Sequence, residues 1–155
     1  MEENKLTLRK AVREDLPAIV AMLADDELGS QREDARVPLA LEYGEAFQDI
    51  DGDSNQLLAV AIIGDDVVGA LQLTFIPGLA RKGAWRGQIE AVRIASEYRS
   101  SGIGQEMFRW AIEQCRLRNC RLVQLTTDKS RPDAHRFYER LGFEATHEGY
   151  KLALK

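Results

Sequence analysis

The stretch from Gln88 to Thr127 limits the possible folds more than any other part of this chain. Gln88–Ala95 has the apolar content of a strand, 103–117 carries the apolar stripe of a helix, and Arg121–Thr127 is again strand-like. A strand, a helix and a second strand in this order form a crossover, and a crossover joins parallel strands. The sequence therefore predicts one parallel strand pair near the C-terminus.

Two long apolar runs upstream predict a hairpin. Gln56–Ile63 is almost continuously apolar, a Gly-Asp-Asp turn follows, and Val67–Ile76 is apolar again. Runs without polar alternation are typical of strands that are buried on both faces. Lys5–Ala11 predicts an earlier strand. Two helices are expected between these strands, on the apolar stripes formed by Leu16, Ile19, Val20 and Leu23 and by Leu39, Tyr43 and Phe47.

The last third of the chain predicts one more helix and one more strand. Ala134–Leu141 has a short helical stripe, and Gly142 stands where helices favour a left-handed cap. Phe143–Leu154 then has a strand pattern. The expected order is β-α-α-β-β-β-α-β-α-β. We therefore predict a mixed α/β fold in a single domain over residues 1–155, with a mostly antiparallel central sheet and flanking helices.

Composition excludes several classes of protein. A net charge of −4 argues against a nucleic-acid binder with a broad basic surface. No apolar run approaches the roughly 20 residues that cross a bilayer, and the first residues are charged where a secretory signal is apolar. We expect a cytoplasmic protein without nucleic-acid or membrane partners. The spacing of Cys115 and Cys120 fits neither a redox pair nor a zinc site, so we expect reduced thiols and no metal.

The loop between the crossover strand and its helix has the features of an anion site. Arg99–Gly104 contains two serines and two glycines, so that the backbone can approach a ligand closely. The free N–H groups of the first helical turn and the helix dipole favour an anion such as pyrophosphate. Met107 stands where a Rossmann loop needs its third glycine, and the Gly-Lys-Ser/Thr of a P-loop is missing. From the loop alone, a steric role in the turn remains an equal alternative.

Two motifs together resemble the GNAT superfamily of N-acetyltransferases. Arg99-x-x-Gly102-x-Gly104 after Val92-x-Ile94 resembles its motif A, and Ala134-x-x-Phe137-Tyr138-x-x-x-Gly142-Phe143 resembles its motif B. The expected element order matches the family fold over essentially the whole chain. Thr126-Thr127-Asp128 and the residues that follow are similar to the small-molecule branch, which includes aminoalkylphosphonate acetyltransferases.

This resemblance implies a splayed parallel strand pair, acetyl-CoA as co-substrate and acetyl transfer to an amine. It implies that the backbone around Val92 pairs with pantetheine and that the glycine loop holds the pyrophosphate. The cofactor-binding residues expected in this way are Val92, Arg93, Ile94, Arg99, Ser100, Ser101, Gly102, Ile103 and Gly104.

The resemblance also implies catalytic residues. Tyr138 aligns with the family's general acid, which protonates the departing thiolate; the alternative is that Tyr138 only fills the core. Glu90 is our candidate for the general base, because regular alternation places it on one strand face with Val92 and Ile94. An exposed edge glutamate is the equal alternative. His135 and His147 are the other candidates for the base, although we expect His135 to be a solvated helix residue and His147 to lie at the surface.

Charged segments suggest the kind of acceptor. The resemblance implies that a basic loop with Arg81, Lys82 and Arg86 around Trp85 lies on the acceptor side, with an acidic segment from Asp25 to Glu45 nearby. They favour a small zwitterionic amine, although ordinary solvated faces are the alternative. The rival functions are a protein N-acetyltransferase and an acetyl-CoA-binding module without catalysis.

The short C-terminus predicts a homodimer. The resemblance implies two antiparallel strands after motif B, but only twelve residues follow Phe143, too few for two ordinary strands and a turn. A last strand with Tyr150, Leu152 and Leu154 would leave an exposed apolar edge, which a second copy can cover.

Overall fold

The computed structural model describes residues 5–155, so the first four residues of the predicted domain lie outside the described part. The strands are β1 (Leu6–Lys10), β2 (Gln56–Ile63), β3 (Asp66–Ile76), β4 (Arg86–Ile94) and β5 (Leu122–Gln124). The helices are α1 (Leu16–Ala24), α2 (Gly29–Arg32), α3 (Leu41–Asp51), α4 (Ala80–Gly83), α5 (Ile103–Leu117) and α6 (Pro132–Arg140), and two 3₁₀ turns are η2 (Arg13–Asp15) and η3 (Ser96–Tyr98).

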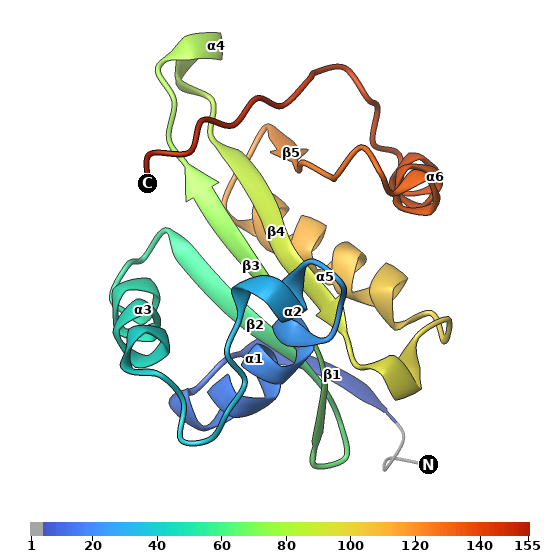
Figure 1. Ribbon diagram of the computed structural model, residues 1–155. Coiled ribbons are helices and arrows are strands. Elements are labelled where there is room, and N and C mark those ends of the chain that lie inside the picture. The colour runs from blue at the N-terminus through green and yellow to red at the C-terminus, as the bar shows by residue number, and fades with distance from the viewer. Residues whose placement is uncertain (1–4) are drawn as a thin grey trace.

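One five-stranded sheet runs through the molecule in the order β1-β2-β3-β4-β5 (Figure 1). All neighbouring strands are antiparallel except β4 and β5, which are parallel. The crossover between them is α5, as the strand-helix-strand pattern predicts. The predicted hairpin is confirmed as β2 and β3, and Ala59, Val60 and Ala61 at its centre are fully buried.

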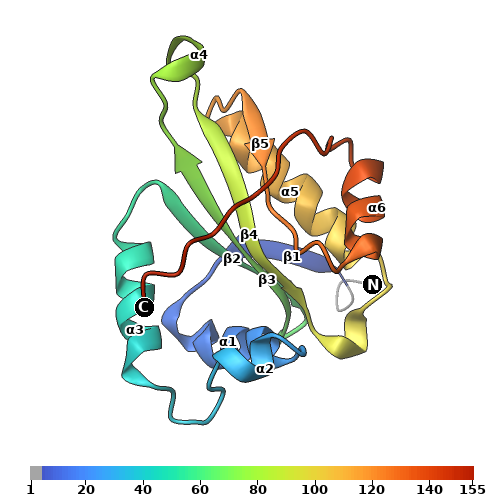
Figure 2. The same ribbon diagram turned by 45° about the horizontal axis from the view of Figure 1, so that its top comes forward.

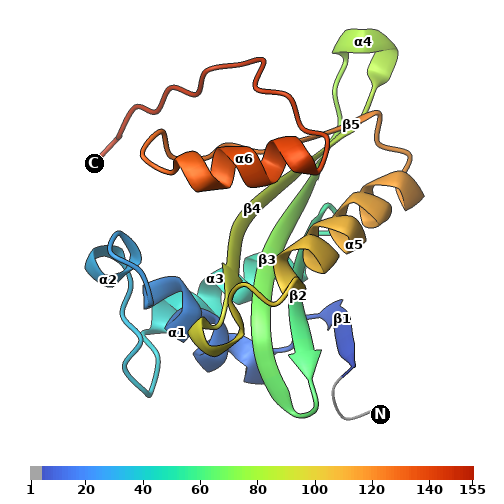
Figure 3. The same cartoon turned by 90° about the vertical axis from the view of Figure 1, so that its right-hand side faces the viewer.

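Helices cover both faces of the sheet. One face of the sheet carries α1 and α3, and the opposite face carries α5 (Figure 3). The residues that form the core on the α5 side include Leu71, Leu73, Ile89, Met107 and Phe108. The core on the other side includes Leu16, Ile19, Phe47, Val60 and Ala70. Two apolar cores separated by one sheet explain why β2 and β3 lack polar alternation.

A bulge interrupts the alternation of β4. Gln72 lies opposite Glu90 and Ala70 lies opposite Arg93, so three residues of β3 face four residues of β4. Ala91 takes a left-handed backbone conformation, with φ of 54°, at this place. One extra residue in a strand shifts the faces of all residues beyond it. The bulge therefore changes which side chains of β4 point toward each core.

The predicted strand over Phe143–Leu154 is wrong. No strand follows α6 in the described chain, and Tyr150, Leu152 and Leu154 are exposed. A strand needs a partner for its backbone groups, and this segment runs back over the side of the sheet with α1–α3 without pairing (Figure 2). The predicted strand Arg121–Thr127 is shortened to β5. The left-handed cap at Gly142 is confirmed, with φ of 100°.

The two cysteines are free thiols, as expected. Cys115 is buried in α5, and Cys120 is half-buried just before β5. Burial is the main reason why the pKa of Cys115 is raised to about 12, and a thiol with such a pKa stays protonated at neutral pH.

Candidate active site

The parallel strands β4 and β5 stay together over only three residues. Arg86, Gly87 and Gln88 lie opposite Leu122, Val123 and Gln124, and β5 ends there. β4 continues to Ile94 and pairs on that stretch with β3 alone. Its other edge, from Glu90 to Ile94, therefore has no strand partner in the described chain. The predicted splayed pair would receive a ligand along this open edge.

The glycine loop lies at the end of this open edge. Gly102 is the N-cap of α5 with φ of 85°, and Ser100 before it is also left-handed, with φ of 64°. A Cβ placed on Gly102 would meet nothing within 4 Å among the described residues. The space beside Gly102 is open, and the first-turn N–H groups of the 15-residue helix α5 are directed to that side.

Gly104 has a different role from Gly102. A Cβ at Gly104 would come to 3.1 Å from Cδ1 of Ile94 and to 3.6 Å from the ring of Phe137. This glycine therefore allows α5 to pack closely against β4 and α6. Of the two glycines in the predicted motif, Gly102 is the one that faces open space.

Tyr138 lies in an aromatic cluster beside the open half of β4. Its ring packs against Phe108, Phe137 and Phe143, with centroid distances of 5.5, 5.7 and 6.2 Å. Burial raises the pKa of Tyr138, while Arg131, a hydrogen bond with Thr127 and Arg93 act in the opposite direction. The hydroxyl end is thus polar, although the ring belongs to the core. Tyr138 stays protonated at neutral pH, as a general acid must.

Glu90 lies on a different face from the one that we predicted. Because of the bulge at Ala91, Glu90 shares its face with Arg93, and Val92 and Ile94 point to the core around α5. Glu90 is exposed. The expectation that Glu90, Val92 and Ile94 share one face is therefore wrong, since a single-residue bulge leaves no mark in an apolar alternation.

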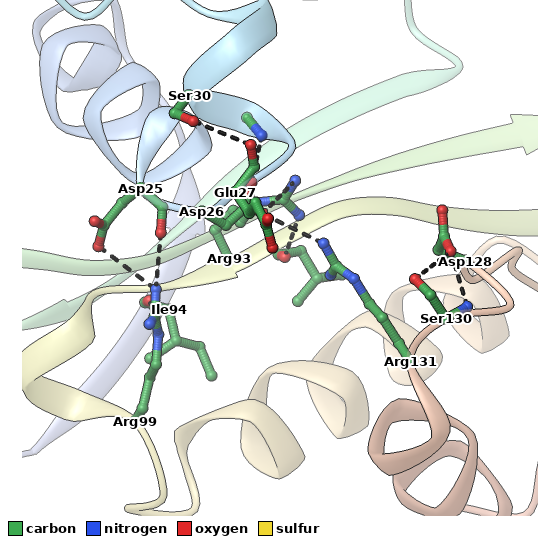
Figure 4. Close-up of polar contacts among 12 residues, drawn as sticks. Asp25, Asp26, Glu27, Ser30, Arg93, Ile94, Arg99, Asp128, Ser130 and Arg131 are labelled. Atoms are coloured by element: carbon green, nitrogen blue, oxygen red, sulfur yellow. Dashed lines mark hydrogen bonds and ion pairs between the residues drawn. The ribbon is translucent and has the colours of Figure 1, made fainter.

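A cluster of charges that the sequence reasoning missed lies over the open half of β4 (Figure 4). Asp26, in the turn between α1 and α2, has Oδ2 at 3.6 Å from Nη2 of Arg93 and at 3.4 Å from Nη2 of Arg131. The neighbouring Asp25 contacts Nη2 of Arg99 at 3.5 Å. The sequence did contain a signal, because an arginine inside the strand Ile89–Ile94 needs a partner for its charge.

The charged segments expected around the acceptor do not face each other. The loop with Arg81 and Lys82 forms α4, which projects beyond the start of β4 and far from α6 (Figure 1). Trp85 packs against the α5 core. In the acidic segment, Asp34 pairs with Arg36, and Glu33 accepts a hydrogen bond from the Tyr43 hydroxyl. The two segments thus do not form a pair of facing walls, and Asp25 and Asp26 contact arginines at the open half of β4 and beyond its end.

The two histidines differ in their surroundings. His147 is exposed, as expected, and its Nδ1 lies 2.6 Å from the Thr146 hydroxyl. His135 is not a solvated residue: it is half-buried, and its Nε2 has no hydrogen-bond partner within residues 5–155.

The described residues contain no group of His, Cys, Asp and Glu that could hold a metal. Within the same part of the chain, no helix combines the length and apolarity needed to span a membrane.

Comparisons with known proteins agree with this geometry. A model of the Acetyltransferase (GNAT) family matches residues 19–143. An aminoalkylphosphonate N-acetyltransferase from Salmonella typhimurium is 30% identical over 150 residues, which cover 95% of this chain and 90% of that protein. The N-alpha-acetyltransferase 30 of Homo sapiens is 33% identical over 88 residues, 57% of this chain and 24% of that protein.

A solved structure is similar over nearly the whole chain. It is described as a transcriptional regulator from Bacillus halodurans C-125, is 51% identical and has a TM-score of 0.94. The match covers 97% of this chain and all of that one. The sheet with its one parallel pair, the glycine loop and the family match lead to one conclusion: the chain belongs to the GNAT acetyltransferase family and is an acetyl-CoA-dependent N-acetyltransferase.

Proposed function

We propose that this enzyme transfers the acetyl group of acetyl-CoA directly to the primary amine of a small molecule. The observation that carries this proposal is the open edge of β4 between Glu90 and Ile94, which has the glycine loop at one end and the polar end of Tyr138 beside it. An elongated ligand with a phosphate end and a reactive end fits this arrangement.

The residues present fit acetyl-CoA. The open space at Gly102 gives phosphates access to the backbone N–H groups of the first turn of α5. The free edge of β4 offers unpaired backbone groups to the amides of pantetheine. In this proposal the cofactor-binding residues are Val92, Arg93, Ile94, Arg99, Ser100, Ser101, Gly102 and Ile103, whereas Gly104 acts through packing. When bound, acetyl-CoA supplies an acetyl group in an activated thioester.

Proton transfer is the task left to the side chains. An alkyl amine with a pKa near 10.4 is almost entirely protonated at neutral pH and must lose a proton before it can attack. The ammonium loses one proton before the attack. As the C–N bond forms and the C–S bond breaks, the nitrogen loses a second proton to solvent and the thiolate gains one. We assign the removal of the first proton to Glu90 through water and the protonation of the thiolate to the hydroxyl of Tyr138.

The small-molecule acceptor is supported by the relative that spans most of the chain, an aminoalkylphosphonate N-acetyltransferase. The rival function, acetylation of peptides, is supported by the partial match to N-alpha-acetyltransferase 30. A module that binds acetyl-CoA without catalysis is the third candidate, and the protonated Tyr138 beside the open half of β4 argues against it.

A panel of acceptors tests the three functions. Purified protein is incubated with acetyl-CoA and with small amines, amino acids, aminoalkyl phosphonates or peptides with free α-amines, and the released CoA thiol is measured. We expect turnover of small amines. Turnover of peptides alone would establish the rival function, and acetyl-CoA binding without any turnover would establish the silent module.

We also propose a homodimer that uses the segment from Tyr150 onward. Tyr150, Leu152 and Leu154 are exposed, and these apolar side chains recur at every second position, as in a strand with one apolar face; β5 is a very short edge strand. Light scattering at micromolar concentration should give twice the 17.4 kDa mass of the chain. Removal of residues 150–155 should give monomers, and a monomeric full-length chain would refute the dimer.

A further inference from the structure

We propose that Arg93 and Arg131 bind an anionic group of the acceptor, so that the preferred substrate is a short amine that also carries a phosphonate, phosphate or carboxylate. This inference rests on the proposed transfer to a small-molecule amine and specifies its substrate class.

The two arginines come from separate elements and meet at one carboxylate. Arg93 projects from the open half of β4, and Arg131 projects from the residue before α6 (Figure 4). Both approach the same oxygen, Oδ2 of Asp26, at 3.6 and 3.4 Å. Three distant parts of the chain thus contribute one residue each, and two guanidinium groups meet at one carboxylate oxygen. Such a convergence is more specific than a single ion pair at the surface.

Within the cluster, a single carboxylate forms ion pairs with two guanidinium groups, while Asp128, which also lies near Arg131, forms hydrogen bonds with Ser130. Asp26 supplies one negative charge against two positive ones, and its pKa is lowered, first by the hydrogen bond that it accepts from the Gly29 N–H and further by both arginines. Asp26 is therefore ionised and also holds the turn between α1 and α2. One carboxylate with this second task does not balance two guanidinium groups.

Arg93 also has a donor that is not used. Its side chain is only 19% exposed; Nη1 donates to the Val92 carbonyl at 2.9 Å, and Nη2 faces Asp26. Its Nε is buried and has no hydrogen-bond partner within residues 5–155. A buried donor on a charged group without a partner is costly, and a ligand oxyanion would satisfy it.

This site is separate from the loop that holds phosphates of the co-substrate. Arg93 lies on the face of β4 that carries Glu90, opposite the face that packs against α5. The glycine loop leads into α5 and lies at the end of β4. The two guanidinium groups thus meet on the side of the sheet that carries α1 and α2. An acceptor can enter from this side while the co-substrate occupies the open edge of β4.

The position of the arginines limits the length of the acceptor. Both guanidinium groups are close enough to Tyr138 to influence its hydroxyl. An acceptor whose anionic group contacts Arg93 and Arg131 therefore places its amine near Tyr138 only if few bonds separate the two groups. A long diamine or a peptide places a neutral or cationic segment against this positive cluster.

Three probes of similar length test the inference: aminoethylphosphonate, β-alanine and propylamine. We expect kcat/KM to be highest for the phosphonate and lowest for propylamine. Arg131→Met should lower the kcat/KM ratio between aminoethylphosphonate and propylamine about 10- to 100-fold, mainly through KM, because charge-assisted hydrogen bonds are lost. Arg131→Lys should restore part of this ratio, and Arg109→Met, which removes an exposed arginine of α5, should leave it unchanged.

The outcomes separate this inference from the proposed function. Arg131 is largely exposed, so its variants should fold, and calorimetric titration with acetyl-CoA checks that they do. Equal turnover of propylamine and aminoethylphosphonate, or an unchanged ratio in Arg131→Met, would overturn the inference and leave a small-amine acetyltransferase. Turnover of peptides alone would overturn both.

Discussion

The two halves of β4 are built in opposite ways. From Arg86 to Gln88 the strand has partners on both sides, β3 and β5. From Glu90 to Ile94 it has β3 alone, and the other edge is open. The first half is paired with β5, and the second half has a free backbone edge and carries the charged residues Glu90 and Arg93. A single strand thus combines a fully paired half with an open half.

A glycine marks each region, and the two glycines illustrate the difference. A Cβ on Gly87 would overlap Sγ of Cys115 and would lie 3.3 Å from its Cβ, so protein atoms already fill that space. A Cβ on Gly102, in the loop that follows the open half, would meet nothing within 4 Å of the described chain. Gly87 therefore permits packing, and Gly102 leaves room for a ligand.

The largest effect is expected for a bulky residue at the open glycine. Gly102→Leu should abolish acetyl-CoA binding in calorimetry, because a side chain would occupy the space for the phosphates. The matched control is Gly142→Leu, since Gly142 also has a left-handed backbone with open space around it. Both variants should lose about 1–2 kcal/mol of stability from backbone strain, but only Gly102→Leu should lose binding. Equal acetyl-CoA affinity in the two variants would refute the role of this loop.

Tyr138→Phe tests the chemistry of the open half. The ring and its packing remain and only the hydroxyl is lost, so kcat should fall about 10²-fold with little change in acetyl-CoA affinity. Because burial raises the pKa of Tyr138, the wild-type acid stays protonated to a higher pH than an ordinary tyrosine, and kcat should not decline through loss of this proton at neutral or mildly alkaline pH. A kcat profile from pH 6 to pH 10 checks both points. A variant with full kcat would make Tyr138 a core residue only.

Gly87→Ala tests the closed half. The added methyl group would press Cys115 out of position and should destabilise the fold by about 1–3 kcal/mol, measured by urea unfolding. The double variant Gly87→Ala/Cys115→Ala should recover part of the loss because the sulfur is removed. Acetyl-CoA affinity of the folded single variant should not change. A large loss of affinity would mean that the two halves are coupled.

Glu90→Gln should have the smallest effect. A base that acts through water is partly replaced by solvent, so we expect kcat/KM to fall about 10-fold at pH 7. The loss should shrink as the pH approaches 10, because more of the acceptor is then already neutral. Glu113→Gln, an exposed glutamate of α5, is the control. A loss that does not depend on pH would indicate that Glu90 supports the structure instead.

The amino-acid sequence predicts most of the fold and part of the site. Apolar period and turn residues predicted the hairpin, the parallel pair and α5, because these elements bury their apolar residues locally. The final strand was predicted wrongly, since Tyr150 and Leu152 have a strand pattern but their segment pairs with no strand of the described chain. The faces of β4 were missed because Ala91 looks like any other strand residue.

The candidate site shows the same limit. The glycine loop and Tyr138 lie in contiguous motifs and could be recognised. The contact of Asp26 with Arg93 and Arg131 joins three segments that lie far apart in the sequence. No local sequence pattern predicts a contact between such distant segments, although the charge of Arg93 within an apolar strand indicates that it has a partner.

The extra residue in β4 has a consequence for engineering. Because Ala91 is the extra residue of the bulge, Val92 and Ile94 pack against the apolar core while Arg93 lies on the other face of the sheet. The charge that meets the acceptor can therefore be altered without repacking the interior around α5. Reversing selectivity from acidic to basic amines would require new side chains at positions 93 and 131, and the residue that replaces Asp26 would still have to accept the hydrogen bond of the Gly29 N–H.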